Sequence, residues 1–153
     1  MDFYKRASIV CQNIPYGTVV TYGQIALLCQ KPKNSRQVGY ALRTGKLGPN
    51  IPAHRILNAS GILSGATSFE TYDQQKILLE SEGVTVIRTD KGWKTDLKKY
   101  QWKTTLDDAL YFESVFNRLY GGVEELYGAK LKAPTVFYKD NDATPYQYPD
   151  DLQ

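Results

Sequence analysis

The sequence has few of the residues that a metal or thiol site requires. Its 153 residues include one histidine and two cysteines. No CxxC or HExxH pattern occurs, which leaves too few soft ligands for a zinc site. Cys11 and Cys29 stand among aliphatic residues and are too few for a disulfide scaffold, so we expect two buried thiols. Neither a metal nor a cofactor is expected.

Long apolar runs are also missing. No stretch approaches the roughly 18 to 20 consecutive apolar residues that a membrane-spanning helix needs, and the N-terminus lacks the apolar core of a secretion signal. The apolar fraction of 42% suits a core packed in water. These features predict a soluble, intracellular, cytoplasmic protein with no membrane partner.

Charge is distributed unevenly along the chain. Residues 1–103 carry 15 Lys and Arg against 7 Asp and Glu, whereas residues 104–153 carry 4 against 9. The basic part favours a polyanionic partner, because neutralising phosphates releases counterions. The change of sign predicts a domain over 1–103 and an acidic C-terminal extension over 104–153. The end of this extension, 140–153, has few aliphatic residues and is expected to be mobile.

Apolar residues at helical spacing predict most of the regular structure. The predicted helices begin after Asp2, Thr21, Asn34 and Thr71, and another runs from Asp107 to Tyr120. Gln24 and Gln37 stand three residues after Thr21 and Asn34, which is the pattern of a capping box. Because a tight turn at Lys31–Lys33 joins the second and third helices, we expect a helix-turn-helix.

Short extended segments complete the predicted domain. Arg55–Leu57 and Ile62–Leu63 flank turn residues and predict a hairpin, which beside a helix-turn-helix would form a wing. Gly45–Pro52 is predicted to be a loop, and Val84–Arg88 a strand. The expected fold class is mainly α with a small β component: a winged helix-turn-helix-like domain followed by a helical C-terminal extension.

Several short motifs follow one another within residues 3–88. They are Ile14-Pro15-Tyr16-Gly17, Thr21-Tyr22-Gly23-Gln24-Ile25-Ala26, Arg36-Gln37-Val38-Gly39, Pro52-Ala53-His54-Arg55 and Glu82-Gly83. In this order they resemble the O6-alkylguanine-DNA alkyltransferase family, which has Pro-Cys-His-Arg where this chain has alanine at position 53. The segment Leu97–Lys103 resembles the end of the alkyltransferase-like branch, in which the acceptor cysteine is replaced. The resemblance implies the winged helix-turn-helix of the DNA-binding domain of these enzymes.

The missing cysteine decides what chemistry the resemblance implies. In the enzymes the cysteine attacks the alkyl carbon on O6 and is consumed. Ala53 offers no nucleophile, so we expect no enzymatic activity and no catalytic residue. What remains is a sensor that flips O6-alkylguanine out of duplex DNA from the minor groove without removing the alkyl group. The resemblance further implies a hand-over to nucleotide excision repair proteins, and we expect a monomer that associates with the nucleoid, or with the nucleus if the source is eukaryotic.

The resemblance also assigns roles to residues. Tyr22 would drive the flip of the nucleotide, and Arg36 would fill the vacated stack. His54 and Glu82 would be the remnant of a proton relay that now buttresses the pocket, and Gly45 stands where the family has a hinge asparagine, which would loosen the hinge. The expected lesion pocket consists of Tyr22, Leu42, Ala53, His54, Arg55, Ser64, Gly65 and Glu82, and the expected DNA contacts are Ser35, Arg36, Gly39, Tyr40 and Arg43.

Alanine at position 53 has two further implications. It would leave the floor of the pocket open, so adducts larger than methyl should fit. It also leaves open an alternative, an active alkyltransferase whose cysteine was replaced by engineering. A second alternative, from another functional class, is a winged-helix transcription regulator that reads base edges in the major groove.

Overall fold

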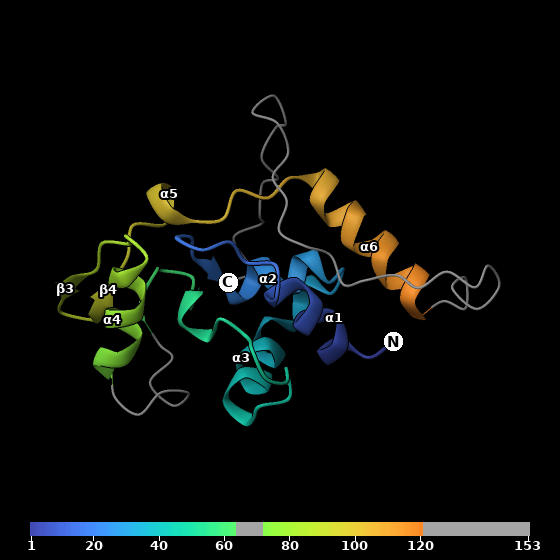
Figure 1. The fold of residues 1–153 in the computed structure, drawn as a ribbon, viewed down its shortest axis with the longest axis horizontal. Coiled ribbons are helices and arrows are strands. Elements are labelled where there is room, and N and C mark those ends of the chain that lie inside the picture. Colours follow the sequence, from blue (N-terminus) through green and yellow to red (C-terminus); the bar gives the residue numbers. More distant parts are fainter. Residues whose placement is uncertain (64–71, 121–153) are drawn as a thin grey trace.

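A computed structural model of the chain describes residues 1–63 and 72–120 (Figure 1). Ser64 and Gly65, Thr71 and the acidic segment 121–153 lie outside the described residues. No helix within the described part of the chain is long and apolar enough to cross a membrane. The structure is mostly helical with short strands, in agreement with the expected fold class.

The first helices begin where their capping residues predict. Helix α1 (Phe3–Cys11) follows Asp2, whose carboxylate accepts the Lys5 backbone N–H at 2.9 Å. Helix α2 (Tyr22–Leu28) follows Thr21, whose hydroxyl oxygen accepts the Gln24 backbone N–H at 3.1 Å. These caps satisfy N–H groups that have no partner within the first turn. The starts of both helices are therefore confirmed.

The two predicted capping boxes are not formed. Gln24 is buried, and its side-chain amide donates to the Trp102 carbonyl at 2.6 Å instead of reaching back to Thr21. Asn34 ends a 3-10 turn, η1 (Pro32–Asn34), and donates to the Gln37 side chain at 2.7 Å without capping α3 (Ser35–Thr44). Tertiary contact for Gln24 and the extra turn before α3 outweigh the local pattern.

The predicted hairpin within 55–63 is wrong. Strand β2 (Ile56–Leu57) pairs in parallel with β1 (Val20–Thr21), and Ile62 bridges instead to Lys94 in β4 (Gly92–Lys94). The turn itself exists, because the Asn58 side chain accepts the Ser60 and Ile62 N–H groups, each at 2.9 Å. A local alternation of residues cannot reveal a strand partner this distant in the chain.

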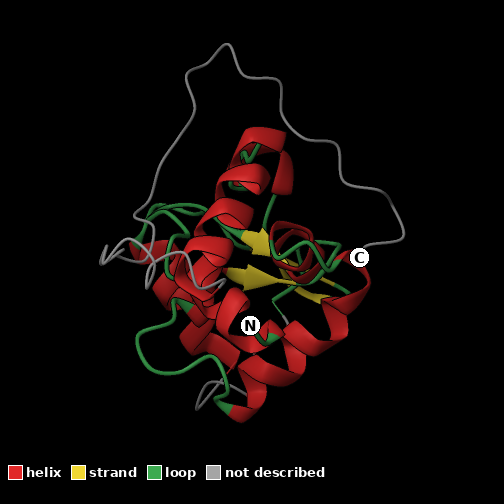
Figure 2. Cartoon of the chain, turned by 90° about the vertical axis from the view of Figure 1, so that its right-hand side faces the viewer, coloured by secondary structure: helices red, strands yellow, loops and turns green. Residues whose placement is uncertain are grey.

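A small antiparallel hairpin takes the place of the predicted strand over 84–88. Strand β3 (Ile87–Thr89) pairs with β4, so the strand begins later than predicted. Val84 and Val86, at the start of the predicted segment, are buried in a core cluster together with Leu79 of helix α4 (Tyr72–Ser81). The strands lie between helices in the view of Figure 2.

The last described helix packs onto the first part of the chain. Helix α6 (Leu106–Tyr120) follows the short α5 (Leu97–Tyr100) and confirms the predicted helix in the extension. Phe112 and Phe116 enter the main core cluster, where the Phe112 ring meets Trp102 edge-on with centroids 6.5 Å apart. In Figure 1, α6 runs along one side of the molecule, and α3 forms the lower edge.

Candidate nucleic-acid interface

Glu82 is the centre of the most highly connected polar cluster near the predicted pocket. Its side chain is 6% exposed, and its Oε2 lies 2.5 Å from Nε2 of His54. Arg55 donates to the same carboxylate with two nitrogens, Nε to Oε1 at 2.8 Å and Nη2 to Oε2 at 2.9 Å. The structure therefore brings together His54, Arg55 and Glu82 as the sequence predicts.

Two further contacts fix this cluster to the N-terminal segment. The Gly17 N–H donates to Glu82 Oε1 at 2.9 Å, and Nη1 of Arg55 donates to the Ile14 carbonyl at 2.8 Å. Burial by itself raises the pKa of Glu82, but hydrogen bonds from Arg55, Gly17 and His54 outweigh it and lower the pKa to about 2. The carboxylate is therefore ionised throughout the physiological range.

Sequence reasoning missed several residues around the cluster. Tyr16 donates its hydroxyl to the Ser81 carbonyl at 3.0 Å and places its ring 5.6 Å from the Arg55 guanidinium carbon. The buried Gln75 donates to the His54 carbonyl at 3.2 Å. The motif at 14–17 was visible in the sequence, but nothing in it indicates a contact with 81–82. Nothing in the sequence predicted that Gln75 is buried, since a polar residue on a helix is usually exposed.

Ala53 opens the 3-10 turn η2 (Ala53–Arg55), directly before His54. Its N–H donates to the Ile51 carbonyl at 2.8 Å, and its own carbonyl accepts the Ile56 N–H, so the turn is held at both ends. The methyl side chain has no lone pair and no proton to exchange. The backbone at position 53 is thus well placed beside the cluster, but the side chain adds only apolar surface.

The two thiols of the described residues, Cys11 and Cys29, are both free and buried. Burial raises the pKa of Cys11 to about 12 and raises that of Cys29 as well, which confirms the prediction of two buried thiols. A neutral, buried thiol is a poor nucleophile. Within residues 1–63 and 72–120, no group of three His, Cys, Asp or Glu side chains could hold a metal ion.

A second group of predicted residues meets where α2 begins beside α3. A Cβ atom added to Gly39 would lie 3.3 Å from Arg43 Nη1 and 3.9 Å from Cε1 of Tyr22. Because Gly39 has no side chain, Tyr22 and Arg43 can both pack close to the α3 backbone at this position. Tyr22, the first residue of α2, is half-buried against the main core.

The remaining predicted contacts on α3 differ in exposure. Arg36, Tyr40 and Arg43 are exposed, Ser35 is half-buried at the start of the helix, and Leu42 is half-buried against the core. Gly45 ends α3 with a φ of 75°, the left-handed conformation that favours glycine at a helix end. Arg36 and Arg43 thus place two exposed positive charges on α3, and arginine is a residue type that can contact phosphates.

The parallel pairing of β1 and β2 joins the two groups. Val20 pairs with Ile56 and Thr21 with Leu57, so Tyr22 follows one strand while Arg55 precedes the other. Residues 20–22 and 53–57 consequently hold a fixed register. Ser64 and Gly65, the predicted wing residues, lie outside the described residues.

The arrangement is matched by known proteins. The family model described as "6-O-methylguanine DNA methyltransferase, DNA binding domain" matches residues 2–84. Alkyltransferase-like protein 1 of Schizosaccharomyces pombe is 37% identical over 103 residues, which are 67% of this chain and 95% of that protein. A DNA base-flipping protein of Escherichia coli is 36% identical over 66% of this chain and 74% of its own length.

A solved structure agrees with the sequence matches. The crystal structure of S. pombe Atl1 in complex with damaged DNA containing O6-carboxymethylguanine superposes with a TM-score of 0.59 at 38% identity, over 67% of this chain and 95% of that one. The chain therefore belongs to the family of the 6-O-methylguanine DNA methyltransferase DNA-binding domain and resembles its alkyltransferase-like and base-flipping members.

Proposed function

We propose that this protein binds duplex DNA carrying O6-alkylated guanine, turns the modified nucleotide out of the helix and holds it without removing the alkyl group. The observation that carries the proposal is Ala53, which stands beside the intact cluster of His54, Arg55 and Glu82. The cluster contains the residues that, by the family resemblance, surround the acceptor cysteine, but position 53 has no sulfur atom to accept an alkyl group. Such a site is suited to recognition of the lesion.

The absence of a nucleophile at position 53 argues against transfer. Displacement at the alkyl carbon on O6 requires an electron pair from the protein, and an alanine methyl group has none. Cys11 and Cys29 are fully buried and do not provide a substitute. His54 directs Nε2 to Glu82, which favours a structural hydrogen bond. The alkyl group therefore stays on the base.

The exposed face of α3 provides the contacts for binding and flipping. Arg36 and Arg43 are both exposed and have the charge to contact DNA phosphates. Flipping costs a few kcal/mol for unstacking, and less where O6 alkylation has already weakened the base pair. This difference favours lesions over normal guanine before any contact with the pocket forms. The relatives support this reading, since one is named a base-flipping protein and another is solved on DNA with O6-carboxymethylguanine.

The test compares matched duplexes that contain guanine or a single O6-methylguanine, at fixed salt, with both strands recovered afterwards and analysed by mass. We expect much tighter binding of the modified duplex, with the methyl group still on the base. Equal binding of the two duplexes, or binding that follows the sequence of undamaged DNA, would instead support the winged-helix regulator. Transfer of the methyl group to the protein would rule out a sensor. The codon at position 53 in the native gene separates a natural alanine from an engineered one.

We also propose that the protein acts as a monomer and passes the lesion to nucleotide excision repair proteins. A protein that leaves the alkyl group in place cannot restore the base, so a second activity has to remove it. Co-purification with and without modified duplex tests this step. A repair partner should associate only when the lesion is bound.

A further inference from the structure

Lys46 lies just beyond the C-terminal end of α3, and its side chain packs against two aromatic rings. Its ammonium nitrogen is 5.5 Å from the centroid of the Tyr4 ring and 5.8 Å from that of Tyr40. A cation over two aromatic rings is held by their quadrupoles. The side chain is exposed, and both rings lie within the range of a cation–π interaction.

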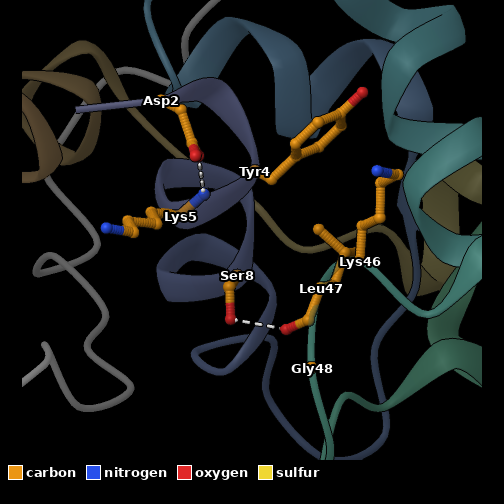
Figure 3. Close-up of a pocket in the computed structure, with 7 residues that line it drawn as sticks. All are labelled: Asp2, Tyr4, Lys5, Ser8, Lys46, Leu47 and Gly48. Atoms are coloured by element: carbon orange, nitrogen blue, oxygen red, sulfur yellow. Dashed lines mark hydrogen bonds between the residues drawn. The ribbon is translucent and has the colours of Figure 1, made fainter.

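The backbone around Lys46 is fixed on both sides. Its N–H donates to the Ala41 carbonyl at 2.9 Å, which ties it to the last turn of α3. The next residue, Leu47, is buried in the main core, and its carbonyl accepts the Ser8 hydroxyl of α1 at 2.8 Å (Figure 3). Lys46 is therefore preorganised, and less conformational freedom is lost when it binds a ligand.

A hollow of about 360 Å³ lies beside Lys46, between the start of α1 and the loop that follows α3. In Figure 3 the Lys46 side chain runs toward the Tyr4 ring, whereas Lys5 points to the opposite side of α1. Asp2 is the acidic residue of the hollow, and its carboxylate is engaged in capping α1. None of the ion pairs within residues 1–63 and 72–120 involves Lys46.

Tyr40 connects this hollow to the proposed DNA-binding face. Its side chain is 45% exposed on α3, the helix that carries Arg36 and Arg43, and its ring is one of the two that hold Lys46. At 1.5 Å per residue, α3 extends about 15 Å, which corresponds to several phosphates along one DNA strand. A strand that follows α3 from Arg36 would thus reach Lys46 beyond the nucleotides nearest the lesion.

We propose that Lys46, held between Tyr4 and Tyr40, binds a backbone phosphate of the flanking duplex and extends the DNA interface from α3 onto the edge of α1. This inference rests on the proposed function for the identity of the ligand. A phosphate contact of this kind carries no information about the base. It strengthens binding to modified and unmodified duplexes alike.

The test measures dissociation constants for the O6-methylguanine duplex and its guanine counterpart over a series of salt concentrations. Lys46→Gln should reduce the slope of log K against log salt by about 0.9, the value for one lost phosphate contact, on both duplexes. The ratio of the two affinities should stay unchanged. Lys46→Arg should keep the slope of the original protein. Lys98→Gln is the matched control, because Lys98 is exposed and belongs to α5, a helix well separated from α3 in Figure 1.

The outcomes separate the inference from the function on which it rests. A slope for Lys46→Gln equal to that of the unchanged protein, or a decrease that Lys98→Gln reproduces, overturns the phosphate contact. A change in the affinity ratio with an unchanged slope also overturns it, since it would place Lys46 at the lesion. If the unchanged protein does not distinguish the duplexes but Lys46→Gln lowers the slope, the lesion function fails and the phosphate contact stands.

Discussion

At the scale of single residues, Glu82 joins segments that are far apart in the sequence. One carboxylate accepts hydrogen bonds from His54, Arg55 and the Gly17 N–H. Removal of such a buried acceptor destabilises the folded protein, because each donor loses its hydrogen-bond partner and is not solvated by water in its place. The family resemblance implies that His54 and Glu82 correspond to the proton relay of an alkyltransferase. In a chain without the cysteine, their hydrogen bond can still stabilise the fold.

Replacement of Glu82 with Gln should lower the free energy of unfolding by about 2–4 kcal/mol at neutral pH. The pKa of Glu82 is about 2 in the folded protein against an ordinary value of 4.5, so protonation favours the unfolded chain. The contribution of about 3 kcal/mol is complete above pH 4.5 and is lost as the pH falls toward 2. Urea unfolding of both proteins across this range should show their difference shrinking. A difference independent of pH would contradict an ionised Glu82 as its source.

Arg36 should act through its shape as well as its charge. If Arg36 fills the vacated stack, as the family resemblance implies, Arg36→Ala should weaken binding to the O6-methylguanine duplex by on the order of tenfold, about 1.4 kcal/mol. Arg36→Lys keeps the charge but not the planar group, so it should lose most of this affinity too. The fluorescence of 2-aminopurine opposite the lesion reports the state of the orphaned base. If Lys restores binding in full, Arg36 is a phosphate contact and no more.

Ala53 should determine which adducts are accepted. With a methyl side chain at this position, O6-methyl, O6-ethyl and O6-benzyl guanine should bind with similar affinity. Ala53→Trp fills the same space and should weaken benzyl binding by about 1–3 kcal/mol more than methyl binding. Competition titrations with the three duplexes measure the series. A steady fall from methyl to benzyl in the unchanged protein would show that the pocket floor is closed.

The sequence predicted the neighbours within each short motif better than the contacts between motifs. His54 and Arg55 were placed beside Glu82 through the family resemblance. Tyr16 and Gly17 were seen as a motif without a contact, because hydrogen bonds across 65 residues leave no local pattern. Residue identity shows which groups can donate or accept, whereas only the fold shows which of them meet.

At the scale of elements, the junction between Gly61 and strand β4 depends on the absence of a side chain. Gly61 has a φ of 79°, and an added Cβ would lie 2.5 Å from the Thr95 carbonyl oxygen. Its own carbonyl accepts the Thr95 N–H at 2.9 Å, so the two backbones are held in close contact. Only glycine meets both requirements.

Gly61→Ala should therefore destabilise the protein by about 2–4 kcal/mol, through backbone strain together with the steric overlap. Gly45→Ala is the matched control, since its φ is 75° but nothing lies within 4 Å of the added Cβ. It should cost only the strain of the left-handed conformation, about 1–2 kcal/mol. Thermal unfolding of both variants measures the difference. Equal losses would mean that the contact with Thr95 relaxes freely.

Helices were predicted correctly where a capping residue and an apolar period coincide, as at α1 and α2. Both signals lie within a few residues of the element that they specify. The strands were predicted less well, because β2 finds its partner in β1 and the Asn58 turn leads to β4. A strand of two residues has too little sequence to encode its partner. The turn predicted at Lys31–Lys33 is present as η1, whereas η2, directly before the predicted hairpin, was not predicted.

At the scale of the whole molecule, α6 supplies part of the core although the charge pattern assigns it to an extension. Phe112 is 0% exposed beside Trp102, whereas Leu110 of the same helix is 53% exposed. The side-chain amide of Gln30 also donates to the Ala109 carbonyl at 2.9 Å. Apolar packing thus crosses the position where the charge of the chain changes sign.

Phe112→Ala should lower the free energy of unfolding by about 3–5 kcal/mol, as expected for a large side chain lost from a core. Leu110→Ala should change it by no more than about 0.5 kcal/mol, because Leu110 faces water. Denaturant unfolding followed by Trp fluorescence compares the two. A small effect of Phe112→Ala would show that residues 1–103 fold without help from α6.

The parallel pairing of Val20 with Ile56 and Thr21 with Leu57 has a kinetic consequence. A long loop must close before this pairing forms, and its entropy is lost before any contact compensates for it. Tyr22 and the turn at 53–55 therefore come into register only when the segment between the two strands has closed. A molecule in which this pairing is broken lacks the proposed binding site, so a bound duplex should slow the opening of the β1–β2 pair.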